Sequence, residues 1–157
     1  MDTSYPFGYH RKFVIYSCID DCTRIAYSKA YESANIENAK KFIDELLQRY
    51  PFGIRSIRTD QWREFSKTIS KYLEDLWINH IKNEPYHPEH NGKIERYHLT
   101  EKSWEVIHRA YLISIEEANY NLRQRLSYYN YKRRHTGLWM NNLTPYDKFL
   151  EIKKMRT

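Results

Sequence analysis

The sequence predicts an α/β domain in which a mixed sheet of five strands is covered by helices. Strand-like and helix-like segments follow one another in the order β β β α β α β α α, which is typical of this class. The chain has 157 residues, the size of one ordinary domain. Its apolar fraction of 41%, with 16% aromatic residues, supplies enough bulk for one core.

Three strands are predicted near the amino terminus. Residues 2–5 have the character of the end of a strand, closed by Pro6-Phe7-Gly8. Residues 13–19 form a nearly continuous apolar run rich in β-formers, as in a strand buried on both faces. Residues 25–31 alternate between apolar and polar types. The turn residues 20–23 between these two segments predict a β-hairpin.

Helices and strands alternate in the middle of the chain. Asn35 is a predicted N-cap for a helix that Pro51-Phe52-Gly53 ends. Residues 54–58 form a short strand leading to Thr59-Asp60. Ser66 is the predicted cap of a second helix, and residues 77–81 alternate as a fifth strand.

The last third of the chain is predicted to be helical. The first helix runs from about residue 93 to 111, and the second covers 114–131. A basic hinge follows, and Thr144-Pro145 opens a short terminal helix. We therefore expect a core domain over residues 1–131 and a basic extension over residues 132–157 that packs on the core or trails it.

The net charge of +6 is concentrated in the carboxyl-terminal half. Residues 1–81 hold 12 basic and 11 acidic residues, whereas residues 82–157 hold 14 and 9, a balance of +5. This asymmetry fits a nucleic-acid partner, and a solvated basic face explains it equally well. The sequence shows no membrane span and no signal peptide. Cys18 and Cys22 make no disulfide framework, which predicts a cytosolic protein.

Three carboxylates stand where metal-dependent chemistry would need them. Asp60 ends a short strand, Glu95 begins a helix after a proline-bounded loop, and Asp2 lies on or beside the first strand. Carboxylate oxygens suit Mg²⁺, and two such ions can activate the attacking oxygen and stabilise the leaving oxygen in phosphodiester chemistry. A strand-end turn for Asp60 and a solvated helix position for Glu95 are the plain alternatives.

Four segments of the chain resemble the integrase catalytic core that retroviral integrases share with DDE transposases of bacterial insertion sequences. They are residues 57–65, the block Pro85-Tyr86-His87-Pro88 to Arg96, residues 129–138 and Leu143-Thr144-Pro145, with 34 residues separating Asp60 from Glu95. The resemblance covers nearly the whole chain and implies a ribonuclease H-like fold. It also implies an Asp-Asp-Glu triad that holds Mg²⁺ or Mn²⁺, with two ions expected when DNA is bound.

The resemblance assigns the triad residue by residue. Glu95 matches the family glutamate and Asp60 matches the second aspartate. Asp2 matches the first aspartate, because the family places it on the strand before the long apolar strand. Asp20 and Asp21 are the alternatives, but the family pattern puts them in the hairpin turn, a place that Asp serves well. The implied reaction cuts a DNA strand with water and joins a 3′-hydroxyl to a target phosphate.

Several side chains near Glu95 are candidates for DNA contact. At 100° per residue, Asn91 and Lys102 share a helix face with Glu95, while Ile94 and Tyr97 point toward the core. Lys93 and Arg96 flank this face and suit phosphate groups. Tyr86 lies in a loop that resembles the family's DNA-contacting loop, where a ring can stack on an unpaired base. Solvated side chains are the alternative for each of these residues.

Other chemistries find little support in the sequence. The histidines near residues 80–98 and the two cysteines lack the spacing of a zinc site. No nucleophile elbow accompanies the serines and histidines either.

The chain also departs from the family pattern. Gln61-Trp62 stands where the family reads Asn-Gly, and Trp77 stands where glycine is usual. The chain begins at the presumed first catalytic aspartate, so the first strand is expected to be truncated.

These departures keep two further functions open. One is a catalytically impaired transposase remnant that only binds DNA, and the other is a different ribonuclease H-like nuclease. The expected partner is double-stranded DNA, both element ends and target, with a homo-oligomer assembled on it. The expected location is the bacterial cytoplasm, on the nucleoid when the protein is bound to DNA.

Overall fold

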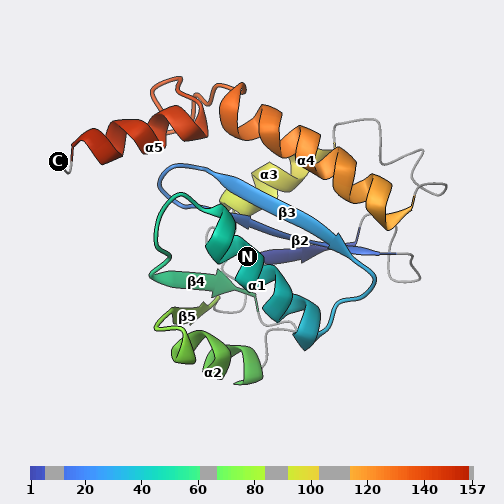
Figure 1. Cartoon of the computed structure of the whole chain (residues 1–157). Helices are drawn as coiled ribbons and strands as arrows, with labels where there is room; N and C mark the ends of the chain where they lie inside the picture. The colour runs from blue at the N-terminus through green and yellow to red at the C-terminus, as the bar shows by residue number, and fades with distance from the viewer. Residues whose placement is uncertain (6–12, 61–66, 84–91, 103–113, 156–157) are drawn as a thin grey trace.

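A computed structural model describes residues 1–5, 13–60, 67–83, 92–102 and 114–155 of the chain (Figure 1). The predicted alternation of strands and helices is confirmed over these residues. The elements are β1 (Asp2–Ser4), β2 (Val14–Ile19), β3 (Ala26–Tyr31), α1 (Ile36–Arg49), β4 (Ser56–Thr59), α2 (Lys67–Asp75), β5 (Asn79–Lys82), α3 (Gly92–Lys102), α4 (Ile115–Tyr131) and α5 (Pro145–Lys154).

The strands form two hydrogen-bonded sheets instead of the single five-stranded sheet that the sequence predicts. Strands β1, β2 and β3 are antiparallel neighbours, and the predicted hairpin of β2 and β3 is confirmed. Strands β4 and β5 pair in parallel. Strand β1 is short, with three residues, and no ladder joins it to β4 in the described structure. The α-amino group of Met1, just before β1, donates a hydrogen bond to the carbonyl of Arg58 at 2.6 Å.

Three predicted helix starts are confirmed by their caps. Asn35 accepts a hydrogen bond from the N–H of Asn38 at 2.8 Å. Ser114 and Thr144 act in the same way at the starts of α4 and α5, where Pro145 occupies the first turn. Each cap satisfies an N–H group that the first helical turn leaves without a partner. Ser66 and the predicted helical residues 103–111 lie outside the described part of the chain.

Helix α1 covers one face of the strands and shares its core with both sheets. Phe42, Ile43 and Leu46 are fully buried beside Tyr16 of β2 and Ile57 of β4. Helices α3 and α4 cover the opposite face, where Ile15, Ala30 and Leu122 form one cluster and Tyr97, Leu126 and Tyr129 another. Strand β2 is therefore buried on both faces, as its apolar run predicts. Within the described residues, no helix combines the length and apolarity needed to cross a membrane.

The outer edge of β3 is closed by two side-chain amides of α4. Asn130 accepts a hydrogen bond from the N–H of Ala26 and donates one to its carbonyl, both at 2.9 Å. Asn119 makes the same pair of contacts with Ala30, at 2.8 and 3.1 Å. Each amide reproduces the donor and acceptor of a neighbouring strand, so α4 takes the place of a further strand at this edge.

Candidate functional site

Asp2 lies at the centre of the candidate site, where β1 meets α3. Its Oδ1 accepts a hydrogen bond from the N–H of Thr3 at 2.8 Å, and its Oδ2 lies 3.3 Å from Nε2 of His98. Burial of the carboxyl opposes its ionisation, but His98 and the Thr3 N–H outweigh this effect, so the pKa of Asp2 is lowered. Asp2 is therefore favoured as a carboxylate, with Oδ1 hydrogen-bonded to Thr3 and Oδ2 at ion-pair distance from His98.

A hydrogen bond from the amino group of Met1 to the carbonyl of Arg58 connects the residue before β1 to β4. In a parallel ladder, an N–H donated to residue 58 pairs the donor with residue 59. In such an alignment, Met1 would lie opposite Thr59 and Asp2 opposite Asp60. The described strands β1 and β4 belong to separate sheets, so the approach of these two carboxylates stays a prediction.

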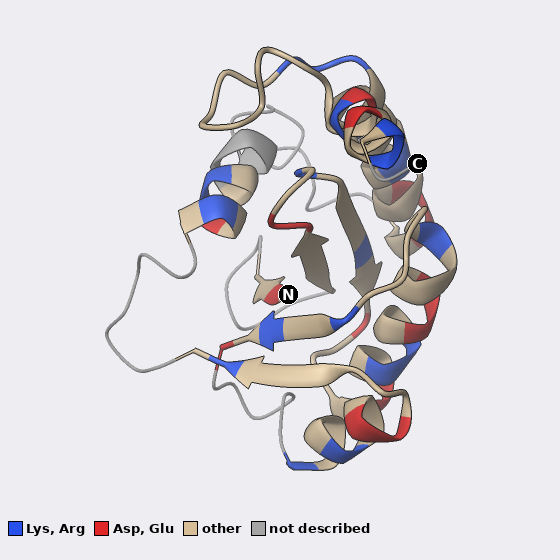
Figure 2. Cartoon of the chain, turned by 90° about the vertical axis from the view of Figure 1, so that its left-hand side faces the viewer, with Lys and Arg blue, Asp and Glu red and all other residues tan. Residues whose placement is uncertain are grey.

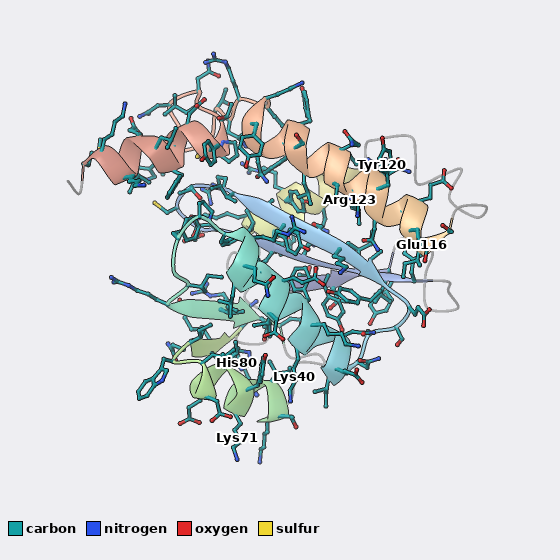
Figure 3. All side chains as sticks on the ribbon, viewed as in Figure 1. Lys40, Lys71, His80, Glu116, Tyr120 and Arg123 are labelled. Carbon is teal, nitrogen blue, oxygen red and sulfur yellow. The ribbon has the colours of Figure 1, made fainter. Side chains whose placement is uncertain are left out.

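The end of β4 is fixed by a buried chain of polar groups. Thr59 is 1% exposed, and its hydroxyl donates to the carbonyl of Asp60 at 2.9 Å. The same hydroxyl lies 2.9 Å from Nε2 of His80, whose Nδ1 lies 2.9 Å from the hydroxyl of Ser70. Figure 3 shows His80 between β5 and α2. Burial, with a contribution from Lys82, lowers the pKa of His80, which favours the neutral imidazole.

Helix α3 brings the third carboxylate to the same region. Its Ile94 and Tyr97 are buried, as the sequence predicts, while Glu95 is exposed in the first turn. His98 follows Glu95 by about one helical turn and faces Asp2, so Glu95 projects from the face of α3 that borders β1. Figure 2 shows α3 on the side of the molecule toward which β4 and β5 point.

Asp2, Asp60 and Glu95 do not form a metal site in the described structure. Among the described residues, no group of three His, Cys, Asp or Glu side chains is placed to hold a metal ion. The sequence does not indicate that His98 is the partner of Asp2. Its grouping with Glu95 on one helix face is a local signal, whereas its contact with Asp2 depends on the folded arrangement of β1 and α3.

The other candidates occupy varied positions. Lys93 is exposed on α3 and contacts the carboxylate of Asp21. Asp20 accepts hydrogen bonds from the N–H and the hydroxyl of Thr23, which is the turn role predicted for it. Arg96 is exposed on α3. Tyr86, Asn91 and the side chain of Lys102 lie outside the described part of the structure, as do Gln61 and Trp62.

Comparisons with known proteins indicate which proteins this chain resembles. Residues 76–145 match the family described as "Integrase core domain". A Spiroplasma virus SpV1-C74 protein named "Putative integrase ORF3" is 30% identical over 168 residues, which cover 94% of this chain and 46% of the viral protein. This chain thus spans about half the length of that curated relative.

Solved structures extend the match to the fold. The catalytic core domain of BIV integrase superposes with a TM-score of 0.72 at 19% identity, covering 99% of this chain and 95% of that chain. The resemblance to integrase catalytic cores is confirmed. A chain from the structure of the simian T-cell lymphotropic virus intasome in complex with the PP2A regulatory subunit B56 gamma gives a TM-score of 0.71 at 16% identity. The match covers 86% of this chain and 47% of that one.

The carboxyl-terminal signature of this integrase-like core has a structural role. The rings of Tyr129 and His135 pack edge to face with centroids 4.8 Å apart. His135 also pairs with Leu143 through the backbone, which closes the loop before the Thr144 cap. Burial and the nearby Arg133 lower the pKa of His135 to about 4. The signature therefore ties α4 to α5.

Trp77 marks a departure from the integrase pattern that the structure makes visible. Its φ is 58°, in the left-handed region that favours glycine, and its side chain is 93% exposed. The N–H of Trp77 donates to the carbonyl of Glu74, and that of Ile78 to Leu73, which ends α2 and starts β5. The turn thus has the backbone geometry that favours glycine, although a tryptophan occupies the position.

Proposed function

We propose that this chain is the catalytic core of a DDE-type transposase or integrase, which cleaves a DNA strand and transfers it to a target. The observation that carries this proposal is the match of the chain to integrase cores in sequence and in fold. Asp2, Asp60 and Glu95 come from three different elements, and the hydrogen bond from Met1 to Arg58 supports placing the first two near each other.

The donor set fits a hard divalent cation. Asp2, Asp60 and Glu95 offer only carboxylate oxygens, which suit Mg²⁺ or Mn²⁺, and two ions are expected with DNA bound. Such ions supply activation of the attacking oxygen and stabilisation of the leaving oxygen. Because His98 and the Thr3 N–H engage both oxygens of Asp2, we expect Asp2 to exchange its contact with His98 when it becomes a ligand.

The residues around the carboxylates suit a double-stranded DNA substrate. Lys93 and Arg96 are exposed on α3, where they can meet phosphates as a point charge and as a planar fork. Asn91 and Lys102 are proposed to contact DNA beside the carboxylates, and Tyr86 to stack on a base. We expect a homo-oligomer assembled on paired element ends, acting in the bacterial cytoplasm on the nucleoid.

The test is strand nicking of a labelled duplex with Mg²⁺, Mn²⁺ or EDTA. Asp2→Asn, Asp60→Asn and Glu95→Gln each remove one charge at nearly constant shape. We expect each to lower nicking by at least about 100-fold while duplex binding changes less than about threefold. Glu74→Gln is the matched control, because Glu74 is exposed on α2 and outside the site.

One observation favours the DNA-binding remnant as the second candidate function. In the described structure the three carboxylates do not form a prepared metal site, and Asp2 is engaged by His98. Binding without metal-dependent nicking in the same assay would establish this alternative and refute the first proposal. Faster cleavage of an RNA–DNA hybrid or of branched DNA than of linear ends would identify another ribonuclease H-like nuclease.

A further inference from the structure

The loop that joins α4 to α5, residues 132–143, presents two large apolar side chains to solvent. Leu138 is 77% exposed and Trp139 is 76% exposed. The next residue, Met140, is 1% exposed and anchors the loop in the molecule. The fold therefore determines which side chains of this loop point inward and which point outward.

The backbone around Trp139 has a conformation that costs free energy. Trp139, Asn141 and Asn142 have φ values of 69°, 52° and 58°, in the left-handed region. Asparagine often adopts this region, whereas for a bulky tryptophan it is an outlier. The N–H of Met140 donates to the carbonyl of Gly137 at 3.0 Å and holds the turn closed. Such conformations persist where the surrounding structure imposes them, and they concentrate at functional sites.

Positive charge accompanies this exposed indole. A run of three basic residues, 132–134, begins the loop, and the sequence has no acidic residue from 118 to 146. Arg134 is exposed and donates to the carbonyl of Asn142 at 3.2 Å, which ties the basic run to the turn that carries Trp139. A guanidinium has five N–H donors, so Arg134 can meet a phosphate while it keeps this bond.

The loop lies close to α3, the helix that carries Glu95. The ring of Tyr129 packs against Tyr97 of α3 with centroids 4.9 Å apart, and against His135 at the base of the loop with centroids 4.8 Å apart. Figure 2 shows the loop extending from α4 and α5 toward α3. A DNA strand that contacts the exposed basic side chains of α3 is therefore near this loop.

Trp77 provides an internal comparison for Trp139. It is also exposed and also has a positive φ, but the exposed carboxylates of Glu74 and Asp75 precede it. Acidic side chains repel the phosphates of nucleic acid, whereas basic side chains attract them. The charge beside each indole, and not the exposure alone, therefore distinguishes Trp139 as a candidate for nucleic-acid contact.

We propose that the loop of residues 132–143 is a DNA-binding site in which Trp139 stacks on an unpaired base. Lys132 and Arg134, both exposed, bind the phosphates beside that base as a point charge and a planar fork. An indole face accepts any base, but in a duplex the faces of the bases are covered by their neighbours. The site therefore favours DNA ends with unpaired bases over blunt duplex. This inference rests on the proposed function, because it takes DNA as the partner, and it adds a contact away from α3.

The test measures binding of the full chain to a blunt duplex and to the same duplex with a short thymine overhang, by fluorescence anisotropy in EDTA. Trp139→Ala is expected to weaken overhang binding at least about fivefold and blunt-duplex binding less than about twofold, because stacking on one base is lost. Trp77→Ala is the matched control and should bind both probes as the unmodified chain does. Because the Trp139 side chain is exposed, denaturant unfolding should show that Trp139→Ala remains folded.

Two further variants at this position separate stacking from general apolar contact. Trp139→Phe keeps a ring and should retain most of the preference for the overhang, whereas Trp139→Leu keeps only apolar bulk and should lose it. A fluorescent adenine analogue in the overhang should be quenched by the unmodified chain and not by Trp139→Leu.

Lys132→Gln tests the phosphate contact. It is expected to weaken binding of both probes by the same factor, about two- to fivefold, and to lower the slope of log affinity against log salt concentration by about one. A loss confined to the overhang probe would contradict the role given to Lys132.

The outcomes distinguish this inference from the proposed function. Equal affinity of Trp139→Ala and the unmodified chain for the overhang probe would overturn the inference, whatever the nicking assay gives. Overhang binding that depends on Trp139 in a chain that does not nick DNA would support the inference and refute the proposed catalysis. If Trp139→Ala changes the sedimentation of the free chain and leaves overhang binding unchanged, the loop is a contact between protein chains and the DNA site is refuted.

Discussion

Each of the two sheets has an outer strand whose backbone groups need hydrogen-bond partners, and the partners differ between the sheets. At the edge of β3, Asn119 and Asn130 of α4 supply the donors and acceptors of a missing strand. At the edge of β4 that faces β1, the amino group of Met1 provides a backbone bond to Arg58. The comparison teaches that side-chain amides can seal an edge covered by a helix, whereas an edge within the layer of strands is met by another part of the backbone.

The two halves also differ in what holds them together. The three-stranded half pairs β2 with β3 over six residues, and its strand pair is buried between α1 and α4. The two-stranded half pairs β4 with β5 over four residues and depends on the chain from Thr59 through His80 to Ser70. We therefore expect β4 and β5 to open at lower free energy than β2 and β3.

The largest effect is expected from Asn130→Ala in the three-stranded half. Loss of the amide leaves both the N–H and the carbonyl of Ala26 without a partner at a partly buried edge. We expect the free energy of unfolding to fall by about 2–4 kcal/mol, measured by chemical denaturation. Gln124→Ala, at an exposed position of the same helix, is the control and should cost less than about 0.5 kcal/mol. An equal loss in both variants would refute the sealing role of Asn130.

A smaller and more local effect is expected from His80→Ala in the two-stranded half. The imidazole connects the end of β4 to α2. Its removal deletes the ring nitrogen to which each of the hydroxyls of Thr59 and Ser70 is hydrogen-bonded. We expect a loss of about 1–3 kcal/mol. In native-state hydrogen exchange, the amides of β4 and β5 should exchange faster, while those of β2 and β3 keep their rates at low denaturant. Uniform acceleration in both sheets would show that the halves open together.

The pH dependence provides a third way to separate the halves. The folded-state pKa of His80 lies below its unfolded value, so the unfolded state binds the proton more readily. The contribution of His80 to the stability of the two-stranded half is therefore fully present above the unfolded pKa of about 6.5. This contribution is lost as the pH falls toward the lowered folded pKa. Hydrogen exchange of β4 and β5, corrected for intrinsic rates, should show this loss. His80→Gln should remove it, and a pH dependence unchanged in this variant would assign the effect elsewhere.

Local patterns predict the elements of this fold because their causes are local. The caps Asn35, Ser114 and Thr144, the hairpin and the two-faced burial of β2 all depend on residues near one another in the chain. The division into two sheets depends instead on pairing between segments far apart in the chain, which periodicity does not report.

The features of the candidate site can be sorted in the same way, into those that the sequence indicates and those that depend on contacts between distant segments. The resemblance points to Asp2, Asp60 and Glu95 because it compares spacing, and their meeting in one site stays a prediction. The contact of His98 with Asp2 and the amides that seal β3 join distant segments. In the sequence, Asn119 and Asn130 resemble solvated helix residues, because asparagine gives no local sign that its partner is a strand edge.

The smallest expected effect has the opposite sign and concerns the turn that joins α2 to β5. Trp77 adopts a φ of 58°, which costs an L-residue about 1–2 kcal/mol, and its exposed side chain returns little packing energy. Trp77→Gly relieves this strain but increases the flexibility of the unfolded chain by about 0.5–1 kcal/mol. We therefore expect a net stabilisation of about 0.5–1 kcal/mol in denaturant unfolding. Trp77→Ala keeps the strain and should leave stability unchanged within about 0.5 kcal/mol. If alanine stabilises as much as glycine, exposure of the indole and not the backbone conformation is what costs stability in this half.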